Sequence, residues 1–160
     1  MRSVLQSGLF LGMLLAGARG SAVAQASGSI TASTTVLTAL SVTGTGDLAF
    51  GTVASTQTKT VAPVAGGRFT VDGPGSGSVL VSFTLPAALG ANVNIGSWTG
   101  LSNKVNVAGT ASALTVSAAG QSQTLSASGR LFVWIGATLN TVSALGGSYS
   151  APVQMTVVYN

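Results

Sequence analysis

The sequence predicts an all-β protein folded as a sandwich, and three observations support this fold class. Apolar and polar side chains alternate with a period of two in one short segment after another. Turn-forming residues, mostly glycines, separate these segments. Beyond residue 27 no window carries the 3.6-residue period of an amphipathic helix. Many short strands at this spacing favour a sandwich over a simple meander.

Glycine and proline set the expected strand boundaries in the front half of the chain. Gly44-Thr45-Gly46 and Gly66-Gly67 are turn signals, and the run from Asp72 to Gly77 is a third. Pro86 ends the strand before it, because proline removes a donor from the hydrogen-bond ladder. The strands expected here are 36–43, 47–53, 58–64, 68–72 and 78–85.

The back half is divided by similar signals. Leu89-Gly90, Ala119-Gly120, Ser128-Gly129 and Gly146-Gly147 are the breaks. Both faces of 131–135 are apolar, which is typical of a strand covered on both sides, and the second cover could be another subunit. The strands expected here are 92–98, 104–107, 113–117, 123–127, 131–138 and 149–159.

The N-terminus has the pattern of a secretory signal peptide. Met1-Arg2 is followed by an apolar stretch of about 15 residues, shorter than the roughly 20 that span a bilayer, and then by small residues ending at Ala26. We therefore expect a signal peptide at 1–26, an extension at 27–45 that leads into the first strand, and one β-sandwich domain at 46–160. The expected location is outside the cell or on its surface, without membrane insertion after cleavage.

The composition argues against an enzyme. Charged residues make up 5% of the chain against roughly 25% in an ordinary domain, and the chain has no His or Cys. Nucleophilic, acid/base and zinc chemistry need side chains that titrate or ligate near neutral pH. No cofactor is expected either. The few cations are scattered, so the basic patch of a nucleic-acid-binding protein is missing. A neutral surface rich in hydroxyl groups is suited to association.

Three local patterns are weaker candidates for a site. The Gly-rich run after Asp72 lacks the lysine and the helix of a phosphate loop. Asp47 and Asp72 lack the neighbouring oxygen ligands of a calcium loop, so Asx turns are favoured. Trp98 and Trp134 could form a platform for sugar stacking, but core packing is the better interpretation.

Two stretches resemble a known family. The segment Asp47-Leu48-Ala49-Phe50-Gly51-Thr52-Val53 is similar to the L-x-F-G strand of spore coat protein U-like domains and archaic, Csu-type chaperone-usher pilins. A finish with Gly136, Leu139, Gly147, Tyr149 and the alternation from Val153 to Tyr159 is similar to the end of these proteins and of a related secreted bacterial family of unknown function. The motif residues of interest are Leu48, Phe50, Gly51, Gly136, Leu139 and Tyr149.

The resemblance implies an immunoglobulin-like sandwich that lacks its last strand and is completed by the N-terminal extension of a neighbouring subunit. It also implies that the C-terminal strand pairs with a periplasmic chaperone, before an outer-membrane usher assembles the subunits. We carry this groove or chaperone-pairing role onto Gly147, Val153, Met155, Val157 and Tyr159. Many archaic pilins have a cysteine pair near the start, and this chain has none.

The extension carries an alternation of its own. The side chains of one face are Ile30, Ala32, Thr34, Val36, Thr38, Leu40 and Val42. Extended, this stretch reaches roughly 40 Å, longer than one small sandwich needs, so its front part is expected to act as a donor strand through Ile30, Ala32, Thr34 and Val36. The alternative is one long edge strand on its own sheet.

These observations predict a structural subunit of an extracellular fibre, pilus or surface coat. It would polymerise with copies of itself by donor-strand complementation and serve cell adhesion and biofilm formation. The alternative function is a monomeric extracellular adhesion or glycan-binding β-sandwich module.

Overall fold

The computed structural model describes residues 29–34, 36 and 38–160. The chain divides into two units, 1–35 and 36–160. The expected signal peptide lies outside the described residues. In the first unit, residues 29–34 are exposed and have no regular secondary structure, and the side chain of Ile30 is 98% exposed. None of the helices in the described residues is long and apolar enough to cross a membrane.

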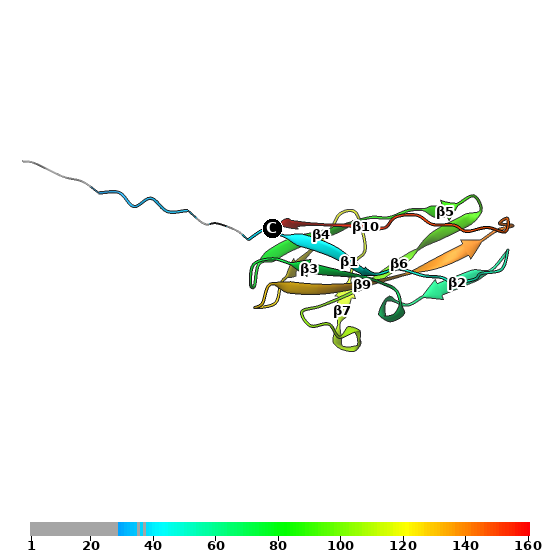
Figure 1. The fold of residues 1–160 in the computed structure, drawn as a ribbon, viewed down its shortest axis with the longest axis horizontal. Coiled ribbons are helices and arrows are strands. Elements are labelled where there is room, and N and C mark those ends of the chain that lie inside the picture. The colour runs from blue at the N-terminus through cyan, green and yellow to red at the C-terminus, as the bar shows by residue number, and fades with distance from the viewer. Residues whose placement is uncertain (1–28, 35, 37) are drawn as a thin grey trace, which may run out of the picture. The chain divides into compact units, whose positions relative to one another are not determined.

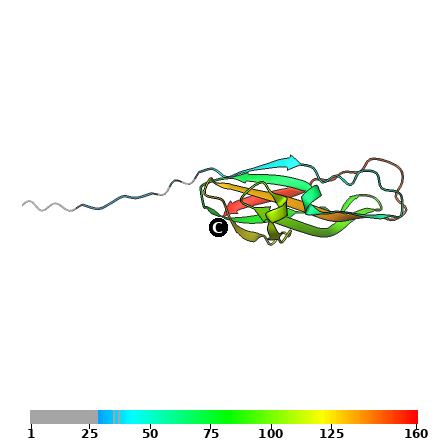
Figure 2. The same cartoon turned by 90° about the horizontal axis from the view of Figure 1, so that it is seen from below.

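The second unit confirms the predicted all-β sandwich, with two antiparallel sheets packed together (Figures 1 and 2). The larger sheet has the order β1-β3-β9-β6-β5, with β2 paired to β9 and β7 paired to β6. The smaller sheet has the order β10-β4-β8. The larger sheet consists of β1 (Ser41–Gly46), β2 (Thr58–Val61), β3 (Gly67–Asp72), β5 (Ala88–Gly90), β6 (Val93–Asn103), β7 (Ser112–Leu114) and β9 (Arg130–Thr141). The smaller sheet consists of β4 (Ser78–Thr84), β8 (Gln121–Thr124) and β10 (Gln154–Tyr159), and the described chain adds two short 3-10 turns, η1 (Pro63–Ala65) and η2 (Ala108–Thr110).

Strand β9 runs through the middle of the larger sheet and has apolar side chains on both faces. Leu131, Val133 and Ile135 point into the core and are almost fully buried. Trp134 points to the other face, yet it is only 3% exposed. Within this unit η1 packs against β9, and a Cβ on Gly136 would collide with the carbonyl oxygen of Val61. The chain itself therefore supplies a cover for the outer face of β9.

The core consists of two clusters. The first lies between the two sheets and comprises the buried residues Val71, Val79, Val81, Phe83, Leu114, Leu125, Leu131, Val133, Ile135 and Met155. The second packs on the far half of the larger sheet and comprises Phe50, Val93, Ile95, Ala137 and Leu139. Trp98 is half-buried against both clusters, as expected for core packing. Trp134 is buried as well, but on the outer face of β9, and it belongs to neither cluster.

Several expected strand boundaries are wrong. Residues 47–53 form no strand, and 104–107 is irregular chain before η2. β1 begins only at Ser41, which pairs with Asp72, the last residue of β3. β10 begins at Gln154, two residues after Pro152, which has no N–H to give to a ladder. The short β5, at Leu89-Gly90, was expected to be a turn.

Candidate functional site: a cavity at the incomplete end of the sandwich

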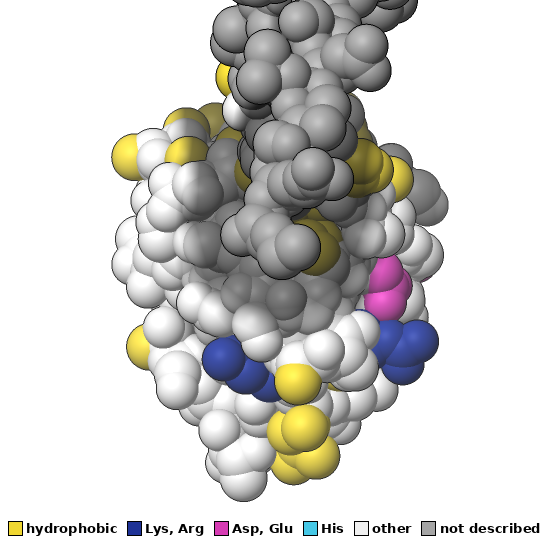
Figure 3. All heavy atoms as spheres, turned by 90° about the vertical axis from the view of Figure 1, so that its left-hand side faces the viewer, with side chains coloured by type: hydrophobic (Ala, Val, Ile, Leu, Met, Phe, Trp, Pro, Cys, Tyr) yellow, Lys and Arg dark blue, Asp and Glu magenta, His cyan; other side chains and the backbone are white. Residues whose placement is uncertain are grey.

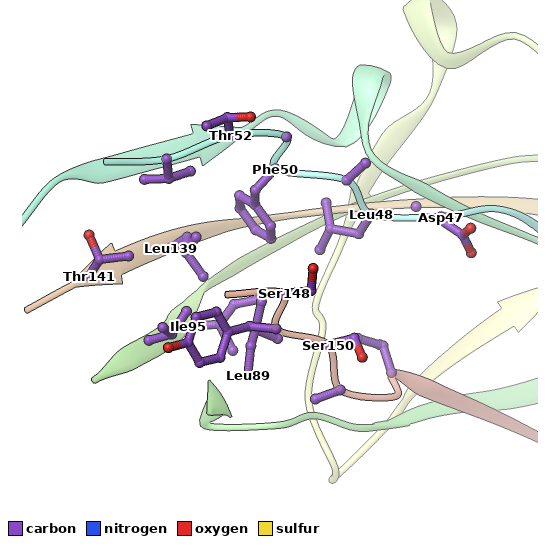
Figure 4. Close-up of a pocket in the computed structure, with 18 of the residues that line it drawn as sticks. Asp47, Leu48, Phe50, Thr52, Leu89, Ile95, Leu139, Thr141, Ser148 and Ser150 are labelled. Carbon is purple, nitrogen blue, oxygen red and sulfur yellow. The ribbon is translucent and has the colours of Figure 1, made fainter. Parts of the chain in front are cut away.

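The smaller sheet covers only part of the larger one. Its strands β4, β8 and β10 pack over the first core cluster. Over the second cluster the opposing layer is formed by two irregular segments, 47–53 and 144–153, which face each other across a gap (Figure 4). One half of the sandwich therefore has a complete second layer and the other half does not.

The gap is a cavity of about 980 Å³. In Figure 4, Leu48 and Phe50 point into it from one side, Leu89 lies opposite, and Thr52 points away. Ile95 and Leu139, from β6 and β9, line it as well. The remaining apolar side chains of the lining include Val53, Phe69, Val93, Ile135, Tyr149 and Val153. A cavity of this kind can take apolar side chains from an added segment.

The backbone beside the cavity has N–H and C=O groups without backbone hydrogen-bond partners. Within the described residues, the backbone of 47–53 makes no hydrogen bond to other backbone groups, and neither does that of 144–153. Among the described residues, one side-chain hydrogen bond reaches this backbone: Tyr149 Oη donates to the carbonyl oxygen of Leu145 at 2.8 Å. Unpaired N–H and C=O groups along an open edge are the template to which an extended segment adds.

Strand β10 offers a regular edge next to the cavity. It pairs with β4, and no strand of the described chain is hydrogen-bonded to its other edge, although β1 packs near it. The N–H of Asn160 donates to the carbonyl oxygen of Ser78 at 3.2 Å. Because hydrogen-bonded and non-bonded pairs alternate in an antiparallel ladder, Thr156 and Val158 also bond to β4. The N–H groups of the intervening residues point to the free edge, at Met155, Val157 and Tyr159.

The wall of the cavity is shaped by glycines. A Cβ on Gly67 would lie 3.4 Å from the Cβ of Leu48, and one on Gly90 would lie 2.5 Å from the ring of Tyr149. The ring of Tyr149 thus rests directly on the backbone of β5. These close approaches hold both irregular segments against the larger sheet without filling the space between them.

Most of the family-motif residues named in the sequence analysis, and some of the groove residues, line this cavity. Its lining contains Leu48, Phe50, Gly51, Leu139, Tyr149, Gly147 and Val153. Met155, Val157 and Tyr159 continue along β10 and pack inward on the first core cluster. Gly136 lies elsewhere, on the face of β9 that η1 covers. Of the expected donor residues, Ile30, Ala32 and Thr34 belong to the first unit and Val36 to the second, and all four are exposed.

Sequence reasoning missed part of the lining. Leu89, Val93 and Ile95 were not assigned to a site, although 92–98 was expected to be a strand. Val93 and Ile95 alternate with the exposed Asn94. This alternation predicts one apolar face of the strand but does not show which residues lie opposite that face. Only the fold shows that the opposing layer is incomplete there.

The cavity is nearly uncharged. Asp47 is the one ionisable acid or base in its lining apart from Tyr149. Among the described residues the only ion pair is Arg130 Nε to Asp72 Oδ1, at 3.0 Å, and no group of three or more metal-ligating side chains occurs. Figure 3 shows one face of the molecule, with a few charged side chains among uncharged ones. The cavity can therefore bury apolar side chains of an added segment, and the backbone beside it can form hydrogen bonds with the backbone of that segment.

No protein-family model, curated protein or solved structure matches this chain.

Proposed function

We propose that the chain is a structural subunit of a secreted bacterial surface fibre or coat, and that subunits join when the N-terminal extension of one fills the cavity of the next. The observation that carries this proposal is the cavity of about 980 Å³, which is lined in part by apolar side chains and flanked by backbone that lacks backbone partners and by the free edge of β10. In the proposed assembly, side chains of the donor enter the cavity and its backbone pairs with the edge.

The extension matches this edge in length and pattern. Residues 27–38, fully extended, reach roughly 40 Å, which is close to the length of the 12-residue strand β9 along which the core lies. Ile30, Ala32, Thr34 and Val36 would share one face of the donor. Ile30 is the largest apolar side chain among them, and it is 98% exposed in the single chain. Burying it is worth about 1.5–3 kcal/mol per contact between subunits.

The second unit favours an open chain of subunits over a closed dimer. The hydroxyl of Tyr159 donates to the carbonyl oxygen of Thr38, so the extension enters this unit at the end where β10 and the chain terminate. The cavity segments lie toward the other end of the unit (Figure 1). A head-to-tail contact of this kind joins two different surfaces and, unless a ring closes, continues as a filament. A periplasmic chaperone and an outer-membrane usher belong to the same proposal.

A pair of matched substitutions tests the assembly. Ile30→Asp should prevent or strongly weaken polymers, because it would bury an unpaired charge in the neighbour's cavity. Thr31→Asp introduces the same charge one residue later, where the side chain of an extended donor points away from the cavity. It should polymerise normally. Both are read by negative-stain microscopy and size-exclusion chromatography of the chain from Ser27 onward.

A peptide experiment gives an independent measurement. A synthetic peptide of residues 27–38 should bind a non-polymerising subunit and raise its melting temperature with peptide concentration, as any ligand of the folded state does. The same peptide with Ile30→Asp is the control. Equal behaviour of the two aspartate variants, together with no shift from the unmodified peptide, would refute donor-strand assembly and point to contacts between subunit faces.

A further inference from the structure

A second hollow opens between the two sheets, away from the cavity described above. Its volume is about 410 Å³, and it shares no lining residue with that cavity. Its polar lining comes from β4, β6, β7 and β8 and from the residue that follows β6, and comprises Ser78, Ser102, Asn103, Lys104, Ser112, Ser122, Gln123 and Thr124. Of these, Asn103 and Ser122 are hydrogen-bonded to residues outside the hollow. It is therefore independent of the proposed assembly.

The interior face of the sandwich is unusually polar at this place. On β8, Gln123 pairs with Val79 and Gln121 with Val81. Directly paired residues point to the same face, and both valines are fully buried, so the two glutamines point inward. Polar side chains at interior positions cost free energy unless they find hydrogen-bond partners.

The two inward glutamines differ in their bonding. Gln121 Oε1 accepts a hydrogen bond from the backbone N–H of Thr115 at 2.7 Å, which explains it structurally. Gln123 Oε1 accepts a hydrogen bond from the hydroxyl of the buried Ser102 at 3.0 Å, which fixes the orientation of the Gln123 amide. The N–H groups of that amide have no hydrogen-bond partner among the described residues. No buried side-chain nitrogen or oxygen of the described residues lacks a hydrogen-bond partner, so the unpaired N–H groups of Gln123 are accessible to solvent.

Other groups of the hollow are equally unengaged. The side chains of Ser78, Ser112, Thr124 and Lys104 make no hydrogen bond within the described part of the chain. Together with the Gln123 amide they supply several neutral donors and acceptors and one cation. Lys104 is the only ionised group of the lining.

We propose that this hollow binds one acidic sugar residue of a polysaccharide. The Lys104 ammonium would bind its carboxylate, and the Gln123 amide with the hydroxyls of Ser112 and Ser78 would bind its hydroxyl groups. The volume is in the range of about 300–1,000 Å³ that small-molecule sites occupy. A hydroxyl-rich ligand suits donors and acceptors that are not ionised, and the single cation selects an acidic sugar over a neutral one.

Calorimetric titration of the full chain tests the ligand class. The probe is trigalacturonate, and the neutral comparison is galactotriose. Trigalacturonate should bind, and galactotriose should bind at least tenfold more weakly. Lys104→Met should weaken trigalacturonate binding tenfold or more, because a charge-assisted hydrogen bond is lost. Lys59→Met changes the net charge equally on the distant β2 and should leave binding unchanged.

A double variant separates binding from folding. Ser102→Ala with Gln123→Met removes both partners of one hydrogen bond and replaces them with apolar groups, which is close to neutral for stability. It should melt at or above the original temperature and lose trigalacturonate binding. Failure of the unmodified chain to bind trigalacturonate, equal weakening by the two lysine variants, or full binding by the folded double variant would each overturn the proposal, whatever the state of assembly.

Discussion

Tyr149 and Gly90 show how single residues keep the cavity open. The ring of Tyr149 lies on the backbone of β5 where any side chain at position 90 would intrude. Its hydroxyl also donates a hydrogen bond to the carbonyl oxygen of Leu145. One aromatic residue therefore anchors the 144–153 segment to the larger sheet.

The smallest possible side chain at position 90 should disturb this anchor. Gly90→Ala places a Cβ 2.5 Å from the ring of Tyr149, so the ring must move, and we expect a loss of about 1–3 kcal/mol in the free energy of unfolding. Gly96→Ala on β6 is the control, because its Cβ would meet nothing within 4 Å. Urea unfolding measures both. A Gly90→Ala protein as stable as the Gly96→Ala protein would contradict the packing described for Tyr149.

Residue patterns in the sequence predicted which side chains face the core, but not what lies opposite them. The alternation of Leu48 and Phe50 correctly indicates a buried face, and both line the cavity. The sequence does not indicate that polar side chains of β8 point inward, because Gln121 and Gln123 resemble the exposed face of an ordinary strand. Their inward direction depends on register with Val79 and Val81, which only the paired strands define.

At the scale of elements, the wrongly predicted strand at 47–53 is instructive. Its alternation is that of a strand, yet a strand exists only where a partner accepts its hydrogen bonds. The described chain offers none, and Gly51 takes a positive φ of 62° there. In the proposed assembly the donor would bring the missing partner, and 47–53 would then form the strand that its pattern predicts.

The free edge of β10 gives a prediction at the same scale. In the unassembled subunit the amide hydrogens of Met155, Val157 and Tyr159 should exchange faster with solvent than those of Thr156 and Val158, which bond to β4. Addition of the 27–38 peptide should slow the first three strongly. NMR-detected hydrogen exchange measures each amide. If the peptide binds but protects none of these three amides, the donor does not pair with β10.

For the whole molecule, the division into units 1–35 and 36–160 predicts separable tasks. Deletion of residues 27–35 leaves every strand of the sandwich in place, since β1 begins at Ser41. The shortened chain should fold, with the circular dichroism of a β protein, and form no filaments. Addition of the 27–38 peptide should raise its melting temperature without restoring filaments. Filaments of normal stability from the shortened chain would show that the extension is dispensable.

The 144–153 segment is the part of the second unit that we expect proteases to cleave first in a subunit outside the proposed assembly. Leu145 at its tip is 81% exposed, two glycines follow it, and its backbone has no backbone partner among the described residues. Proteases cleave such loop tips first. A cut there would separate β10 from the rest of the chain, whereas a donor lying across the segment would shield it. Limited digestion with chymotrypsin should therefore nick free subunits near Leu145 and spare those in filaments, so that subunits left outside the fibre are the ones degraded.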